Sequence, residues 1–302
     1  MKKNKYLFVA GMLFIIFVVS MGLTGVYVRF TDQKEDKKKL TVVTSFYPVY
    51  IAAMNLTKDI PNVKLENLSE PQTGCLHDFQ LTPEDMKLLS TADVFIINGG
   101  GIESFMKEVA SAYPDLIIIE AGEYVELLSE GDEVNAHAWL SVPCYRDMVQ
   151  AVAAGLSDAD SVHANLYTQN AAIYDDKLSV LEKEQKEVIQ QLSGRNVVIF
   201  HEAFEYIAQD YGMQVSCVLD LDEERPVSAG EVSDVLDAVQ TEHADLILAE
   251  ELYGKSVATA VLKEADVTVI YLDPLNRGEY DSDSYLKGME ENITLLKECN
   301  NA

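Results

Sequence analysis

The chain has 302 residues and a formal net charge of −27, from 23 basic and 50 acidic residues. This length predicts two domains or lobes of about 150 residues each. A surface so acidic repels nucleic acid and attracts cations, which excludes nucleic-acid binding as the function.

The N-terminal segment, residues 1–30, predicts export. Three lysines precede an uncharged, mainly apolar run, Tyr6–Val28, which Arg29 closes. The run is long enough to span a bilayer of about 30 Å and exceeds the apolar core of about 7–15 residues in a cleaved signal peptide. We expect an uncleaved signal anchor, a transmembrane helix with its N-terminus inside; a cleaved signal peptide is the alternative. Residues 31–39 are polar and charged, which predicts a flexible tether.

From Leu40 onward, short β-branched runs alternate with amphipathic stretches, a pattern typical of parallel α/β sheets. The expected strands are 40–44, 63–68, 94–98, 116–120, 196–200, 214–219, 246–250 and 267–272. The helical patterns between them include 83–91, 102–112, 229–242 and 255–264. The two sets of strands predict two α/β lobes, an N-terminal lobe over residues 40–160 and a C-terminal lobe over residues 194–302.

A long helical stretch without Gly or Pro, Ser161–Leu192, lies between the two sets. Its apolar residues recur mostly at spacings of three and four, so one face is apolar. A helix of that length measures about 45 Å, enough to run along both lobes. We expect a rigid interlobe spine helix over residues 161–193. The alternative, a coiled-coil dimer seam, needs sustained heptads that the stretch lacks.

Three of the five histidines lie in loops that follow expected strands, and a carboxylate lies after a fourth strand. His77 and His137 belong to the first half, and His201 and Asp273 to the second. Ligands of open α/β sheets bind at the carboxyl ends of the strands. We therefore expect these four residues to bind one divalent metal ion in the cleft between the lobes. Four protein ligands close a tetrahedral zinc shell, which suits carriage rather than hydrolysis.

The sequence gives weaker evidence that other polar residues support the metal site. Asp78, Glu202 and Glu250 are candidates to orient the imidazoles, and each is equally well explained as a solvated carboxylate. His163 and His243 are expected to be structural or surface residues.

The four cysteines, Cys75, Cys144, Cys217 and Cys299, belong to an exported chain in which disulfides can form. They allow three pairings, and spacing alone does not choose between them. The intralobe option pairs Cys75 with Cys144 and Cys217 with Cys299. Cys75 lies two residues before His77, so a thiolate metal ligand is a further option.

Several short sequences resemble one known family, the zinc and manganese solute-binding proteins of bacterial ABC importers, which includes the ZnuA-like and adhesin-like receptors. In chain order they are Val42–Pro48, His77-Asp78-Phe79 before Leu81-Thr82-Pro83, His137-Ala138-Trp139-Leu140, Phe200-His201-Glu202-Ala203-Phe204 and Leu272-Asp273-Pro274-Leu275. The resemblance covers nearly all of residues 40–300. It implies that His77, His137, His201 and Asp273 are the metal ligands and that the protein is not an enzyme.

By this resemblance the protein captures a divalent metal at the extracytoplasmic face of the cell membrane, or after secretion if the N-terminal segment is cleaved. It delivers the metal to an ABC permease driven by its ATPase, and it acts as a monomer. Histidine at position 201 favours Zn²⁺, because imidazole suits zinc better than it suits manganese. Mn²⁺ is the alternative. A surface adhesin and a zinc hydrolase are the competing functions.

The chain departs from the family pattern in three places. The acidic segment 120–135 contains no histidine, so a metal-collecting role for this loop is weakened. Asn135 and Ala136 replace residues that often precede the second histidine, which alters a hydrogen bond expected from that side. No cysteine precedes Cys75, so lipid attachment is not available and the transmembrane segment takes its place.

Overall fold

The computed structural model describes residues 3–32, 39–131, 133–221 and 225–299. The chain divides into two compact units, Met1–Lys39 and Leu40–Ala302. Each unit is described by itself.

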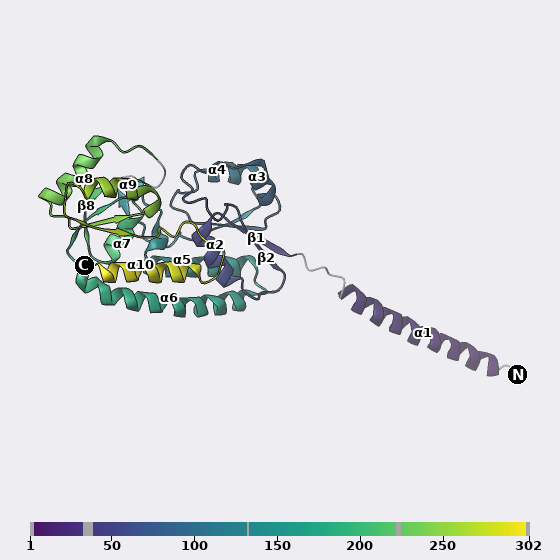
Figure 1. The fold of residues 1–302 in the computed structure, drawn as a ribbon. Helices are drawn as coiled ribbons and strands as arrows, with labels where there is room; N and C mark the ends of the chain where they lie inside the picture. Colours follow the sequence, from purple (N-terminus) through teal and green to yellow (C-terminus); the bar gives the residue numbers. More distant parts are fainter. Residues whose placement is uncertain (1–2, 33–38, 132, 222–224, 300–302) are drawn as a thin grey trace. The chain divides into compact units, whose positions relative to one another are not determined.

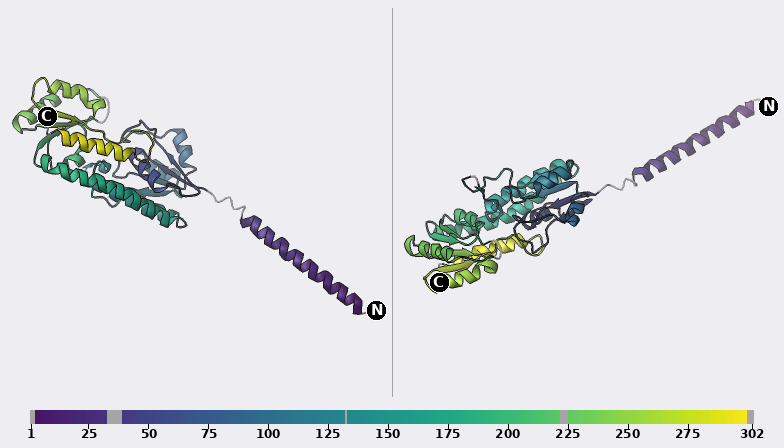
Figure 2. Two further views of the ribbon diagram at one scale, coloured as in Figure 1. Left: turned by 60° about the horizontal axis from the view of Figure 1, so that its bottom comes forward. Right: turned by 90° about the horizontal axis from the view of Figure 1, so that it is seen from above.

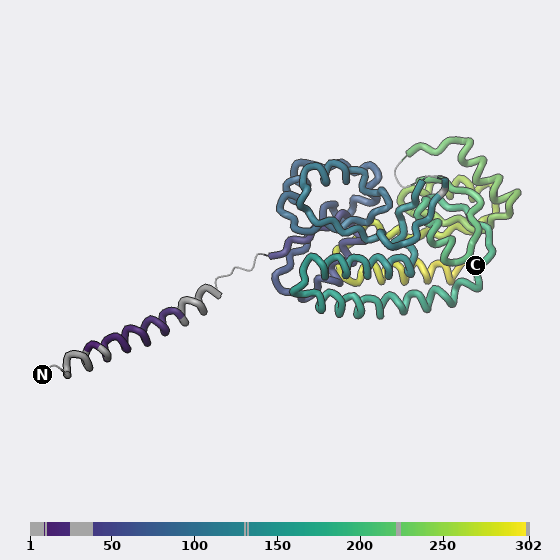
Figure 3. The backbone as a smooth tube through the Cα atoms, turned by 180° about the vertical axis from the view of Figure 1, so that it is seen from behind, coloured from purple at the N-terminus to yellow at the C-terminus, as the bar shows by residue number. Residues whose placement is uncertain are grey.

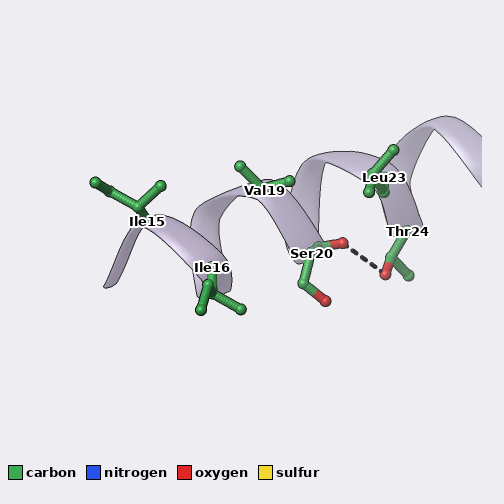
Figure 4. Close-up of a pocket in the computed structure, with 6 residues that line it drawn as sticks. All are labelled: Ile15, Ile16, Val19, Ser20, Leu23 and Thr24. Atoms are coloured by element: carbon green, nitrogen blue, oxygen red, sulfur yellow. Dashed lines mark hydrogen bonds between the residues drawn. The ribbon is translucent and has the colours of Figure 1, made fainter. Parts of the chain in front are cut away.

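The first unit is one helix, α1 (Lys3–Asp32). Ile15, Ile16, Val19 and Leu23 lie along it as exposed apolar side chains, and Thr24 Oγ1 donates a hydrogen bond of 2.8 Å to a backbone carbonyl one turn earlier (Figure 4). All of these residues belong to the one helix. Over the described residues, no helix is long and apolar enough to cross a membrane.

The signal anchor and the tether remain predictions. Residues 33–38, which make up most of the predicted tether, lie outside the described residues, as do residues 1 and 2 at the start of the positively charged flank.

Two parallel four-stranded sheets form the second unit (Figure 1). The first has the strand order β2-β1-β3-β4 and the second the order β10-β9-β7-β8. The strands are β1 (Leu40–Thr44), β2 (Val63–Asn67), β3 (Val94–Ile97), β4 (Ile117–Glu120), β7 (Asn196–Ile199), β8 (Gln214–Val218), β9 (Leu246–Ala249) and β10 (Thr268–Tyr271). A short antiparallel pair, β5 (Ser129–Glu130) and β6 (Glu133–Val134), lies between the sheets in the chain. The predicted class, two parallel α/β lobes, is confirmed.

The helices of the second unit connect and cover the sheets (Figures 1 and 3). They are α2 (Tyr47–Leu56), α3 (Pro83–Leu89), α4 (Met106–Ala112), the 3₁₀ helix η1 (Ala138–Leu140), α5 (Val142–Ala159), α6 (Ala164–Leu192), α7 (Phe204–Asp210), α8 (Ala229–Thr241), α9 (Glu251–Val261) and α10 (Ser284–Glu298).

Helix α6 is the predicted spine. It packs against α5, α10 and α2, and Figure 2 shows it running beside α10 along the molecule. Tyr167, Tyr174, Leu178 and Val188 on its inner face are buried. The main hydrophobic core includes these residues together with side chains from both sheets. The two lobes therefore share one core and are joined by a continuous helix.

The helix predicted over residues 102–112 begins late, at Met106. Gly99, Gly100 and Gly101 all have positive φ, the left-handed conformation that favours glycine. The buried Glu103 side chain then accepts hydrogen bonds from the backbone N–H groups of Asn98 at 2.7 Å and Gly99 at 3.1 Å. These bonds hold the chain in a turn before the helix can start.

The intralobe disulfides are absent from the structure. Cys144, Cys217 and Cys299 are free thiols, so neither Cys75–Cys144 nor Cys217–Cys299 is formed. Cys75 lies instead beside a histidine, as described below.

Candidate metal centre

Three loops bring the three predicted histidines together. His77 lies between β2 and α3, His137 is the N-cap of η1, and His201 follows β7 after one residue. The Nε2 atoms of His77 and His137 are 3.4 Å apart, and the rings of His137 and His201 pack edge to face with centroids 5.1 Å apart. The cluster thus joins candidate ligands from both lobes.

The ring of His137 is held in one tautomer. Its Nδ1 lies 2.9 Å from Oδ1 of Asn135, an atom that only accepts hydrogen bonds, so Nδ1 carries the proton. Asn135 is itself fixed, because its Nδ2 donates to the Glu202 carbonyl at 2.9 Å and to Glu205 Oε2 at 3.0 Å. His137 Nε2 therefore presents its lone pair toward His77, as a metal-bound imidazole must. Although Asn135 replaces the usual residue of the family motif, its side chain still makes a hydrogen bond to the His137 ring.

His201 is buried with neither ring nitrogen satisfied. Its relative exposure is 0%, and neither Nδ1 nor Nε2 has a hydrogen-bond partner. A buried polar group left in this state costs about 1–3 kcal/mol. A metal ion bound at one nitrogen would remove part of that cost, so the His201 ring fits a cation site.

Burial keeps the two interior imidazoles uncharged. Desolvation lowers the pKa of His201 to about 3, and His77 and Arg277 act in the same direction. Desolvation also lowers the pKa of His137 well below its ordinary value of 6.5, and the neighbouring His201 and His77 add to the effect. Neutral imidazoles keep the lone pair that binds a metal, so neither ring has to lose a proton at neutral pH before it can act as a ligand.

Two of the suggested supporting carboxylates lie beside the rings. Glu202 Oε1 is 3.4 Å from His137 Nδ1 and 3.8 Å from His77 Nε2. Glu250 is buried, with Oε2 4.0 Å from His201 Nδ1. Their negative charge favours a cation among the three rings.

Asp273, the fourth predicted ligand, stays a prediction, and it lines a pocket with Glu250, the carboxylate beside His201. The Asp273 side chain is exposed, and its Oδ1 accepts a hydrogen bond of 2.8 Å from the Leu275 backbone N–H. The carboxylate lines a surface pocket with Arg277 and Glu291. Asp78, the third suggested supporting carboxylate, is exposed as well.

A thiol is part of the cluster. Cys75 Sγ lies 3.5 Å from His137 Nε2, and Cys75, His77 and His137 each offer one donor atom within 4.8 Å of the others. Asn276 Nδ2 donates to the same sulfur at 3.0 Å. In the sequence, the only sign that Cys75 belongs to the site is its position two residues before His77. The only sign for Asn276 is its position directly after Leu275, the last residue of a family motif.

The remaining two histidines are a helix cap and an exposed turn residue, in line with the predicted structural or surface roles. His163 is the N-cap of α6, with Nδ1 2.7 Å from Asp160 Oδ2. His243 lies in an exposed turn with a positive φ of 57°.

Two parallel sheets joined by a long helix, with a polar cluster at the carboxyl ends of their strands, define a two-lobed solute-binding protein. Within this class, the chain belongs to the family described as ZnuA, zinc-uptake complex component A, periplasmic, which matches residues 42–299. The family is one of substrate-binding components and not of enzymes. The resemblance drawn from the sequence motifs is thereby confirmed.

Individual relatives have similar lengths and different metals in their names. The manganese-binding lipoprotein MntA of Halalkalibacterium halodurans is 26% identical over 289 residues, covering 93% of this chain and 95% of that protein. The high-affinity zinc uptake system protein ZnuA of Bacillus subtilis is 25% identical over 288 residues, covering 88% and 89%. The crystal structure of the Zn(II)-bound ZnuA-like domain of Streptococcus pneumoniae AdcA is 26% identical with a TM-score of 0.74, covering 87% of this chain and 100% of that domain.

Proposed function

We propose that this protein captures a divalent metal ion, Zn²⁺ in the first place, and delivers it to an ABC permease whose ATPase drives import. The observation that carries this proposal is the cluster of three imidazoles, of which His137 and His201 are buried. His137 directs a lone pair toward His77, and His201 has two buried ring nitrogens without hydrogen-bond partners. In a family of substrate-binding components, the ion held by such a cluster is the cargo.

Zinc is preferred on the chemistry of the donors. Imidazole nitrogen suits zinc, whereas manganese prefers carboxylate and water oxygens. His77, His137 and His201 all offer nitrogen, and the nearest carboxylates, Glu202 and Glu250, lie beside the rings at 3.4–4.0 Å. Manganese is the second candidate, supported by the similarity to a protein named for manganese binding.

Capture takes place on the extracytoplasmic side. Relatives with the same fold are named as lipoproteins or as periplasmic components. We propose that residues 1–30, in which three lysines precede an apolar run, anchor the protein at the membrane. A native mass spectrum of the protein recovered from the cell surface would report both the bound metal and any N-terminal cleavage.

A metal titration of histidine variants tests the proposal. Wild-type protein should bind one zinc ion per chain, and His201→Ala should weaken binding by about 100-fold or more, because even supporting residues around a metal contribute about 10–100-fold. The matched control is His243→Asn, which changes an exposed histidine in a turn that asparagine tolerates. Unchanged zinc affinity after joint replacement of His77, His137 and His201 by alanine would refute the assignment.

A further inference from the structure

The sulfur of Cys75 lies at a distance from His137 Nε2 that suits two donors of one tetrahedral zinc ion. With zinc bonds of about 2.05 Å to nitrogen and 2.3 Å to sulfur, tetrahedral geometry places two nitrogens about 3.3 Å apart and a nitrogen and a sulfur about 3.6 Å apart. The structure has 3.4 Å between the Nε2 atoms of His77 and His137, and 3.5 Å between His137 Nε2 and Cys75 Sγ. Both separations match edges of one coordination tetrahedron.

A chain of hydrogen bonds holds the sulfur in this position. Arg277 Nε donates to Asn276 Oδ1 at 3.1 Å, and Asn276 Nδ2 donates to Cys75 Sγ at 3.0 Å. Asn276 is 2% exposed, so this link is shielded from water. The two hydrogen bonds therefore fix the sulfur beside His137 Nε2.

The guanidinium also lies close to the backbone next to Cys75. Gly74 has a φ of 83°, and a Cβ at this position would lie 3.2 Å from Arg277 Nη2. Glycine at position 74 therefore allows both the turn and the close approach of the positive charge. Arg277 is fixed from the other side by Glu250, whose Oε1 lies 3.3 Å from Nη2.

We infer that Cys75 is the fourth protein ligand and that the centre is a Cys-His₃ site formed by Cys75, His77, His137 and His201. The inference rests on the proposed function for the three histidines and adds a sulfur donor to them. When the metal binds, the Cys75 thiol gives its proton to water and the sulfur lone pair forms the bond to the ion. A thiolate selects zinc and other soft or borderline cations and disfavours manganese.

Cobalt loading tests the inference by spectroscopy. Co²⁺ in the wild-type site should show a thiolate-to-metal charge-transfer band in the near ultraviolet. The band should persist when Cys144, Cys217 and Cys299 are all replaced by serine, since that variant keeps only Cys75. It should also persist in Asp273→Asn and disappear in Cys75→Ser. A wild-type spectrum without this band, or a band that survives Cys75→Ser, overturns the inference.

Affinity measurements separate ligation from a structural role. Cys75→Ser should weaken zinc binding by about 100-fold or more, exceeding the range of about 10–100-fold for supporting residues, and should weaken manganese binding far less. Asn276→Ala keeps the sulfur, so it should keep the cobalt band while weakening zinc binding by about 10–100-fold. Equal losses for zinc and manganese in Cys75→Ser would indicate a structural role and reject the inference.

The same set of variants distinguishes the two proposals. If the histidine variants lose zinc and Cys75→Ser binds it as wild type does, the inference about Cys75 fails and the proposed function stands. If the triple histidine variant binds zinc normally, the proposed function fails. If Cys75→Ser does not fold, the cobalt spectrum of the variant that keeps only Cys75 decides.

Discussion

Glu103 connects the glycine turn to the loop that carries His137. Its carboxylate accepts hydrogen bonds from Ser45 Oγ at 2.8 Å and from the Asn98 backbone N–H at 2.7 Å. The Asn98 side chain in turn donates to the Ala136 carbonyl at 2.9 Å, next to His137. Desolvation raises the pKa of Glu103 from 4.5 to about 7, against the opposing effect of these hydrogen bonds.

This shift predicts a pH dependence of stability. The folded state binds the Glu103 proton more tightly than the unfolded state, so the contribution is complete below pH 4.5 and is lost as the pH rises through about 7. The change amounts to between about 3 and 4 kcal/mol, since one pKa unit corresponds to about 1.4 kcal/mol. Urea unfolding of wild type and Glu103→Gln across this range should show the wild type losing stability relative to the variant as pH rises. A constant difference would show that Glu103 does not titrate in this range.

At the scale of single residues, the structure brings the three predicted histidines together, and Asp273 stays a predicted ligand. His77, His137 and His201 stood out because histidine is scarce in this chain and each follows a strand. The turn that follows Asp273 is a detail that the sequence does not reveal. Leu275 adopts a positive φ of 51°, and the turn directs Asn276 toward Cys75 while Asp273 accepts a hydrogen bond from the Leu275 backbone.

At the scale of elements, strands were easier to predict than helices. Each of the eight predicted strands agrees with the structure to within one residue at either end. The clearest are β3 and β9, which are short, fully buried apolar runs typical of parallel sheets. Helix starts depend on tertiary contacts. Helix α4 is delayed by Glu103, and α9 begins at Glu251 rather than at Lys255 because the chain turns into the helix directly after β9.

The short helix η1 connects the two lobes through Trp139, which is fully buried. Its Nε1 donates a hydrogen bond of 2.9 Å to the Pro274 carbonyl, and Tyr285 donates one of 2.7 Å to the Trp139 carbonyl. Trp139→Phe removes the first bond and leaves the carbonyl at position 274 without its partner. The expected cost is about 1–3 kcal/mol of unfolding free energy.

Circular dichroism is the appropriate measurement, since Trp139 is the only tryptophan and its fluorescence is lost with it. Leu252→Ala provides a control, because this side chain is 63% exposed and should leave the urea midpoint nearly unchanged. Equal midpoints for Trp139→Phe and wild type would mean that the interlobe hydrogen bond contributes nothing to stability.

At the scale of the whole molecule, the shared core and the spine helix argue for a rigid receptor. Side chains from both sheets and from α6 belong to one hydrophobic core, so the lobes cannot separate without exposing it. Asn170 on α6 also donates to the Leu56 carbonyl at 2.9 Å, which ties the helix to the first lobe. We expect that metal binding selects a nearly complete site and does not close an open hinge.

One cooperative thermal transition is therefore expected for the unit from Leu40 onward, and zinc should move that transition as a whole. Since the ion binds the folded state, zinc at about 1,000 times its dissociation constant should add about 4 kcal/mol to the unfolding free energy. Differential scanning calorimetry with and without zinc measures the shift, and the variant with alanine at positions 77, 137 and 201 should show none. Two separate transitions, with only one responding to zinc, would contradict the shared core. A zinc shift in the triple variant would place the ion elsewhere.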